Sequence, residues 1–164
     1  MRVRSLWRAA WLAMFFLLGG CSNTAILKNP SSTPETYWQG RLSVKVFSNP
    51  VQAFTASFEL QGQPSEGELI LTSPLGSTLA RMRWTPSSAV LISNGAERHF
   101  DSLQALAQQA TGADIPVASL FAWLRGIQED APGWQANLED AVNGRISARH
   151  IEAVQAEFKI ILER

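Results

Sequence analysis

The sequence predicts an α+β fold, built on one strongly curved antiparallel sheet with two or more short helices covering its concave side. Six segments between Trp38 and Phe100 alternate apolar and polar residues, the pattern of strands with one buried face. After Phe100 the pattern changes to that of two short amphipathic helices, and alternation returns near the C-terminus. Because strands twist in a right-handed sense, a sheet this long acquires a concave side. We expect the helices to lie across that concavity.

The N-terminal residues 1–20 have the pattern of a cleaved secretory signal peptide. Arg2, Arg4 and Arg8 precede an uncharged apolar stretch of ten residues, 9–18. A helix that spans a bilayer needs roughly 20 apolar residues, so a permanent transmembrane anchor is the weaker interpretation. The tetrapeptide Leu18-Gly19-Gly20-Cys21 matches the lipobox at which bacterial lipoproteins are cut and lipidated.

Cys21 is the only cysteine of the chain, so the fold must hold without disulfides and the thiol is expected to carry lipid. The expected groups are an S-diacylglycerol and an N-palmitoyl chain on Cys21, with no metal and no other cofactor. The alternative is an ordinary signal peptide followed by a stray cysteine. Ser22 follows where Asp would retain the protein at the inner membrane. By resemblance to the sorting rule of proteobacterial lipoproteins, Ser22 predicts a periplasm-facing anchor in the outer membrane.

Charge and composition limit the possible partners and the domain organisation of the rest of the chain. Cleavage before Cys21 removes three arginines and no acid, which leaves 11 Lys and Arg against 14 Asp and Glu, a net charge of −3. Nucleic-acid binding requires the opposite sign, so nucleic acid is excluded as a partner. Residues 21–36 are rich in Ser, Asn, Thr and Pro, the composition of a flexible spacer. Residues 37–164 are long enough for one domain with a sizeable core.

The strands are predicted from alternation and from turn residues. The expected strands of the first part are 38–46, 54–61, 68–72, 78–84, 89–93 and 96–100. Asn94-Gly95 is the strongest short signal for a two-residue hairpin. Asn143-Gly144 predicts a second hairpin, between strands 134–142 and 145–150, and a last strand alternates over 158–162. The first six strands therefore form an antiparallel meander.

Two helices are predicted between the sixth strand and the C-terminal strands. The first has Asp101 as N-cap, Gln104 three residues later, and Gly112 at its end. The second has Pro116 near its first position and Gly126 as its stop. Both helices have one apolar face, which has to pack against the sheet.

The turn Ser73-Pro74-Leu75-Gly76 has an apolar residue where hairpin tips are normally polar. Ser at the first position, Pro at the second and Gly at the fourth are favoured in a type I turn, which puts Leu75 at the tip. Leu75 either folds back onto the domain or projects into an apolar partner. Insertion of one leucine into acyl chains is worth about 1.5–3 kcal/mol. That is enough to engage a membrane that a lipid tether already holds nearby.

Catalysis finds little support in the sequence. The chain has only two histidines, His99 and His150, and it lacks metal-ligand spacing, a Gly-x-Ser-x-Gly motif and a glycine-rich phosphate loop. His99 has Arg98 and Asp101 nearby, which would permit a proton relay, but a solvated strand histidine is far commoner. We expect that the protein is not an enzyme.

Four segments resemble the LolB family of outer-membrane lipoprotein receptors: residues 38–44 (WQGRLSV), 67–77 (GELILTSPLGS), 111–117 (TGADIPV) and 120–126 (LFAWLRG). The resemblance implies an incomplete antiparallel β-barrel covered by helices, with a hydrophobic cavity inside. It also implies a function, in which the protein accepts lipoproteins from the soluble periplasmic carrier LolA and inserts them into the outer membrane. The resemblance thins after Gly126, and 127–164 is shorter than in the longest family members. The resemblance therefore makes no prediction for the far wall of the cavity.

The expected acyl-chain cavity follows from strand parity and helix spacing. The sheet contributes Leu42, Val44, Val46, Phe54, Phe58, Leu69, Leu71, Met82 and Trp84, and the second helix contributes Leu120, Phe121 and Leu124. An error of one residue in register would turn any of these strands over. The resemblance also implies that Pro74, Leu75 and Gly76 form a membrane-engaging loop. The expected partners are a LolA-type carrier with its lipoprotein cargo and outer-membrane lipids, and the expected state is a monomer.

Two other functions fit the same residues. In a structural or assembly-partner lipoprotein, the sheet packs an ordinary core and leaves no ligand-sized cavity. A receptor or store for a free lipid, or for a small apolar molecule, would use the same pocket as a lipoprotein receptor. Only the family resemblance separates this last function from lipoprotein transfer.

Overall fold

The structure, a computed structural model, describes residues 37–111, 114–152 and 155–163. Cys21, Ser22 and the rest of the chain before Tyr37 lie outside the described residues. The elements in chain order are β1 Tyr37–Val46, β2 Gln52–Gln63, β3 Glu66–Thr72, β4 Thr78–Thr85, β5 Ser88–Ser93, β6 Ala96–Phe100, α2 Leu103–Thr111, α3 Val117–Leu124, β7 Trp134–Asn137, the 3-10 helix η3 Ala141–Asn143, β8 Arg145–His150 and β9 Ala156–Leu162.

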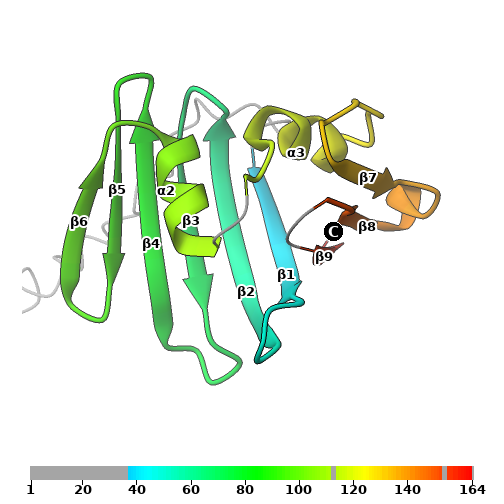
Figure 1. Cartoon of the computed structure of the whole chain (residues 1–164). Coiled ribbons are helices and arrows are strands. Elements are labelled where there is room, and N and C mark those ends of the chain that lie inside the picture. Colours follow the sequence, from blue (N-terminus) through cyan, green and yellow to red (C-terminus); the bar gives the residue numbers. More distant parts are fainter. Residues whose placement is uncertain (1–36, 112–113, 153–154, 164) are drawn as a thin grey trace, which may run out of the picture. The chain divides into compact units, whose positions relative to one another are not determined.

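The nine strands of the described residues belong to one antiparallel sheet, in the order β6-β5-β4-β3-β2-β1-β9-β8-β7. The first six form the predicted meander, and β9 returns to pair with β1. In the view of Figure 1, β7 and β8 run at a steep angle to β2–β6. Within the described residues no pairing joins the two edge strands β6 and β7, so the sheet does not close. The fold is α+β with an incomplete antiparallel barrel, as predicted.

The register gathers the apolar side chains on one face of the sheet, which we call the inner face. Val44 of β1 lies opposite Phe54 of β2 and Phe158 of β9. On the other side of β2, Phe58 lies opposite Leu71. Since side chains alternate between faces along each strand, these cross-strand pairs place every second residue of each strand on this face. The opposite face carries most of the charged side chains of the strands, with ion pairs such as Glu68 with Arg81 at 3.6 Å.

Both helices pack on the inner face. In α3, Phe121 lies edge-on to Trp38 of β1 and to Trp84 of β4, with ring centroids 5.7 and 6.4 Å apart. The neighbouring Trp123 is fully buried, with its ring 5.9 Å from that of Phe158 in β9. In α2, Leu106 is 1% exposed and belongs to the same core. One continuous apolar core therefore lies between the helices and the sheet.

The buried tryptophans also fix the loops around the core. Each of three indole N–H groups donates to a backbone carbonyl: Trp84 to Gln63 at 3.0 Å, Trp123 to Glu129 at 2.9 Å and Trp134 to Asp114 at 3.0 Å. A buried indole N–H without an acceptor would be costly, so each ring satisfies its donor while it holds a neighbouring chain segment in place: the end of β2 at Gln63, and the loops at Glu129 and Asp114.

Local turn chemistry is confirmed at one hairpin and corrected at two other sites. Asn94 and Gly95 have φ angles of 52° and 75° between the paired residues 93 and 96, as a two-residue turn requires. The N-cap of α2 is Ser102 rather than Asp101, because the Ser102 Oγ accepts a hydrogen bond from the Ala105 N–H at 3.1 Å. Asn143-Gly144 is not a two-residue hairpin turn, since β7 ends at Asn137 and η3 lies in the connection.

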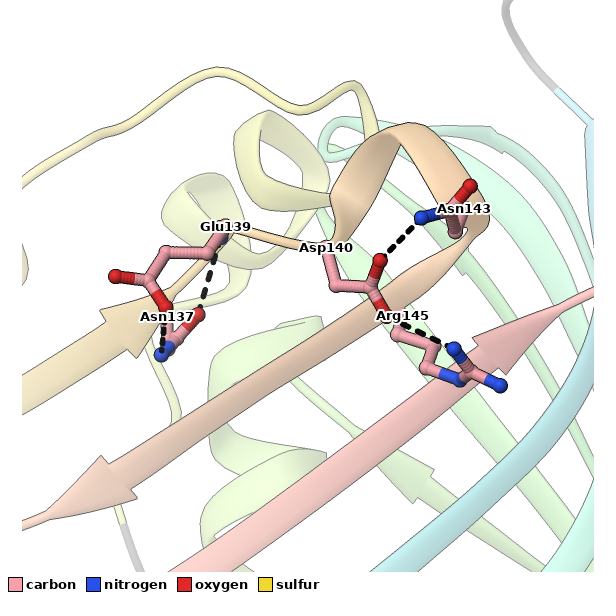
Figure 2. A network of polar contacts seen from close by, with 5 residues as sticks. All are labelled: Asn137, Glu139, Asp140, Asn143 and Arg145. Atoms are coloured by element: carbon pink, nitrogen blue, oxygen red, sulfur yellow. Dashed lines mark hydrogen bonds and ion pairs between the residues drawn. The ribbon is translucent and has the colours of Figure 1, made fainter.

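A polar network explains the longer connection between β7 and β8 (Figure 2). The Arg145 Nη1 donates to Asp140 Oδ2 at 2.9 Å, and the Asn143 amide donates to the other oxygen of the same carboxylate. The Glu139 N–H donates to Asn137 Oδ1 at 3.0 Å. These bonds stabilise residues 138–144 as a folded loop, in place of the tight turn that Asn143-Gly144 alone predicts.

The Asp140 network predicts a pH dependence of stability. The hydrogen bonds from Asn143 and then from Arg145 hold the pKa of the Asp140 carboxyl below its usual value. Its stabilising contribution is therefore present above the pKa of about 3.9 for an unfolded chain, and it is lost as pH falls through the lower folded-state pKa. We expect Asp140→Asn to lower the unfolding temperature at neutral pH but not at pH 2. Thermal unfolding followed by circular dichroism checks this, and an equal loss at both pH values would contradict it.

Candidate functional site

The nine sheet residues predicted to face a cavity all lie on the inner face. Cross-strand partners place them there, for example Leu69 beside Met82 and Val44 beside Phe54. Six of the twelve predicted cavity residues are half-buried: Leu42, Val44, Val46, Leu69, Met82 and Leu120. Phe54 is 40% exposed. An apolar surface with access to solvent therefore follows β1 to β4, and Leu120 of α3 is its one helix residue. We call these seven residues the accessible inner surface.

The other five predicted cavity residues pack against one another and against the core. These are Phe58, Leu71, Trp84, Phe121 and Leu124, all less than 9% exposed. Phe121 fills the space between Trp38 and Trp84. In this conformation the five residues form the floor of the accessible inner surface rather than walls around an open space.

Leu75 projects from the β3–β4 connection, where its side chain is 95% exposed. The Gly76 N–H donates to the Ser73 carbonyl at 2.9 Å, which closes the turn, and the Ser73 N–H donates to the Ser77 carbonyl at 2.8 Å. Gly76 has a φ of 85°, a conformation that favours glycine. The register of β3 with β4 shifts between Leu71 and Thr72, at the base of this loop. The loop is thus held in one shape while its apolar tip makes no contact with the core.

The two histidines lie in different surroundings. His99 is exposed on the outer face and lies 3.1 Å from the Glu97 carboxylate, rather than in a relay with Arg98 and Asp101. The His150 ring lies tilted by 53° against the Trp134 ring, with centroids 5.1 Å apart. Among the described residues, no group of three His, Cys, Asp or Glu side chains is placed to hold a metal ion. None of the described helices has both the length and the apolar character needed to cross a membrane.

Sequence reasoning missed part of the inner face. Phe158 and Ile160 of β9 are buried there, opposite Val44 and Leu42 of β1. Their alternation was visible in the sequence, but pairing with a strand more than 100 residues earlier has no local signal. Trp38 was also missed, although it lies in the first predicted strand and contacts Phe121.

The sequence is similar to one family of known proteins over most of the domain. The family model described as outer membrane lipoprotein LolB matches residues 36–159. An outer-membrane lipoprotein LolB from Chromobacterium violaceum is 27% identical over 154 residues, which cover 90% of this chain and 82% of that protein. One from Bordetella petrii is 34% identical over 151 residues, with coverage of 87% and 74%.

Proposed function

Because the chain belongs to the LolB family of outer-membrane lipoproteins, we propose that it accepts lipoproteins from a LolA-type periplasmic carrier and inserts them into the outer membrane. The family role is that of a lipoprotein receptor, and the protein is not an enzyme. The finer steps, which are transfer from the carrier, binding of acyl chains at the inner face and release into the bilayer, are parts of this proposal.

The observation that carries the proposal is the accessible inner surface. Apolar side chains on the central strands of a sheet covered by helices are normally buried, yet Leu42, Val44 and Phe54 retain access to solvent. Each methylene moved from apolar surroundings into water costs about 0.8 kcal/mol, so one acyl chain of about 16 carbons costs roughly 12 kcal/mol. A lipoprotein therefore needs an apolar surface throughout its passage. We propose that the acyl chains of the cargo lie along this surface.

The direction of transfer follows from the relative affinities of carrier, receptor and bilayer for the cargo. We propose that the cargo passes downhill from carrier to receptor and downhill again into the bilayer, since a transfer without an energy source must lower the free energy at each step. The receptor stands between carrier and bilayer, so it must bind acyl chains more tightly than the carrier does and less tightly than a membrane does. An apolar surface of intermediate affinity meets both conditions. The partly covered inner face supports this intermediate affinity.

Membrane contact is proposed for the loop Pro74-Leu75-Gly76, and anchoring for a lipid on Cys21. One exposed leucine contributes about 1.5–3 kcal/mol on insertion, too little to hold a protein but enough to act beside a lipid anchor. With Ser22 after the lipidated cysteine, the proposed location is the periplasmic side of the outer membrane, where the protein acts as a monomer.

The transfer reaction tests this function. The mature chain with Cys21→Ala is mixed with carrier loaded with a labelled lipoprotein, and the label is followed first to this chain and then to liposomes. We expect the label to leave the carrier and to reach the liposomes. If the folded protein takes no cargo from the carrier, the receptor function is wrong and a structural lipoprotein takes its place.

A further inference from the structure

The tips of three hairpins lie at one end of the sheet. The connections β1–β2, β3–β4 and β5–β6 follow alternate strands of an antiparallel meander, so they leave the sheet on the same side (Figure 1). Thr72 at the end of β3 lies opposite Ser57 of β2, which places the Leu75 loop beside the first half of β2. The β1–β2 tip, residues 47–51, is thus at the end of the sheet that carries Leu75.

The β1–β2 tip exposes large apolar side chains of its own. Phe47 is 44% exposed and Val51 is 55% exposed, and Phe54 three residues later is 40% exposed. The Phe47 N–H donates to the Gln155 carbonyl at 2.9 Å, which ties the tip to the start of β9. Loop tips usually carry polar residues, so three exposed apolar residues on one hairpin call for an apolar partner.

The two apolar tips themselves are uncharged, as contact with a lipid interior requires. No charged residue occurs over 46–58 or over 69–80, the stretches that contain the two apolar tips. Lys45 directly precedes the first of these stretches, and its Nζ lies 4.8 Å from the centroid of the Phe47 ring. A lysine beside apolar residues can bury its stem while its amine stays at the level of lipid headgroups.

We propose that the β1–β2 tip, with Phe47 and Val51 at its head, is a second membrane-contacting element that enters a phospholipid bilayer together with Leu75. This inference rests on the proposed function, since it assigns a further contact to the same membrane step. Two neighbouring hairpin tips orient the domain where one leucine does not. They bring Phe54, at the border of the accessible inner surface, next to the bilayer that receives the acyl chains.

The tether is long enough for this orientation. The spacer 21–36 joins the domain at Tyr37, at the end of β1 opposite its tip. At about 3.3 Å per residue, the ten residues of β1 span roughly 33 Å. The 16 residues of the spacer reach about 55 Å when extended. A lipid on Cys21 therefore allows the apolar tips to touch the membrane that holds the anchor.

The test uses the mature chain with Cys21→Ala, which has no other cysteine. Phe47→Cys, Val51→Cys, Leu75→Cys and Val142→Cys are each labelled with an environment-sensitive fluorophore and mixed with vesicles of phosphatidylethanolamine and phosphatidylglycerol. Val142 is the matched control, because it is apolar, 74% exposed and lies in the β7–β8 loop at the opposite end of the sheet. We expect a blue shift of the fluorescence emission at positions 47, 51 and 75 and none at 142.

A second experiment uses the unlabelled double variant Phe47→Ser/Val51→Ser. It should bind vesicles about tenfold more weakly and keep its uptake of cargo from the carrier.

The outcomes separate this inference from the proposed function. A shift at 75 without a shift at 47 and 51 overturns the second contact and leaves the role of Leu75 standing. No shift at any position overturns both membrane contacts, while cargo uptake still tests the receptor function. An equal shift at 142 means unspecific adsorption and also overturns the inference. If the double variant unfolds at the wild-type temperature and binds vesicles equally well, the tip has no part in membrane contact.

Discussion

Leu75→Glu is expected to accept cargo from the carrier but to transfer it to liposomes at least tenfold more slowly than the wild type. The side chain is 95% exposed and makes no core contact, so the substitution leaves folding and the inner face unchanged. It removes an insertion worth about 1.5–3 kcal/mol and adds a carboxylate that resists leaving water. The label from the cargo should therefore accumulate on this variant while liposomes are present.

Val142→Glu is the matched control for this experiment. Val142 is also an exposed apolar residue on a loop, but it lies at the other end of the sheet. The control should transfer cargo to liposomes at the wild-type rate. If both variants are slowed alike, the effect comes from charge and not from the loop. If Leu75→Glu transfers cargo normally, the membrane role of Leu75 is wrong.

Gly40→Ala is expected to cause a large loss of stability through a single added methyl group. A Cβ at Gly40 would overlap the Ile161 carbonyl oxygen, and it would lie 2.9 Å from the carbonyl carbon and 3.0 Å from the Leu162 Cα. These are backbone atoms of β9, so β1 and β9 must move apart. Overpacking of this kind costs about 1–3 kcal/mol, and more where backbone has to shift. For a domain of this size, a loss of 3 kcal/mol lowers Tm by about 10 °C.

Gly95→Asn serves as the comparison for this stability measurement. A Cβ there meets no atom within 4 Å, and asparagine tolerates the φ of 75° better than other residues. Thermal unfolding of the two variants should therefore differ by several degrees. Equal unfolding temperatures would mean that β9 does not lie against Gly40, and the pairing that joins the C-terminal strands to the meander would be wrong.

Local signals predict most of the fold, and the exceptions are one turn and one long-range strand pairing. Asn94-Gly95 was recognised because the turn demands positive φ at both positions, which few residues provide. The prediction of a two-residue turn at Asn143-Gly144 is wrong because the Asp140 network stabilises a longer loop. Side-chain contacts of that kind leave no periodic signal in the sequence. The place of β9 beside β1 was not predictable, since strand pairing across the whole domain depends on how the sheet curves.

The sequence predicts which face of the sheet each residue of the candidate site lies on, but not how deeply its side chain is buried. Alternation placed Val44 and Trp84 on one face, and the register agrees. It does not distinguish Val44, which keeps solvent access, from Trp84, which Phe121 covers. That difference depends on where α3 packs. The exposed Phe47 and Val51 were missed because they follow no strand period, although the uncharged stretch 46–58 marks them in the sequence.

Photocrosslinking along β1 tests most directly whether the inner face holds the acyl chains of the cargo. A photoreactive amino acid is placed in turn at Leu42, Ser43, Val44 and Lys45, and the protein is loaded with a lipoprotein that carries labelled acyl chains. Because side chains alternate between faces, crosslinks to the acyl label are expected from 42 and 44 and not from 43 and 45. Crosslinks from 43 and 45 alone, or none from 42 and 44 while cargo remains bound, would contradict acyl-chain binding at the inner face.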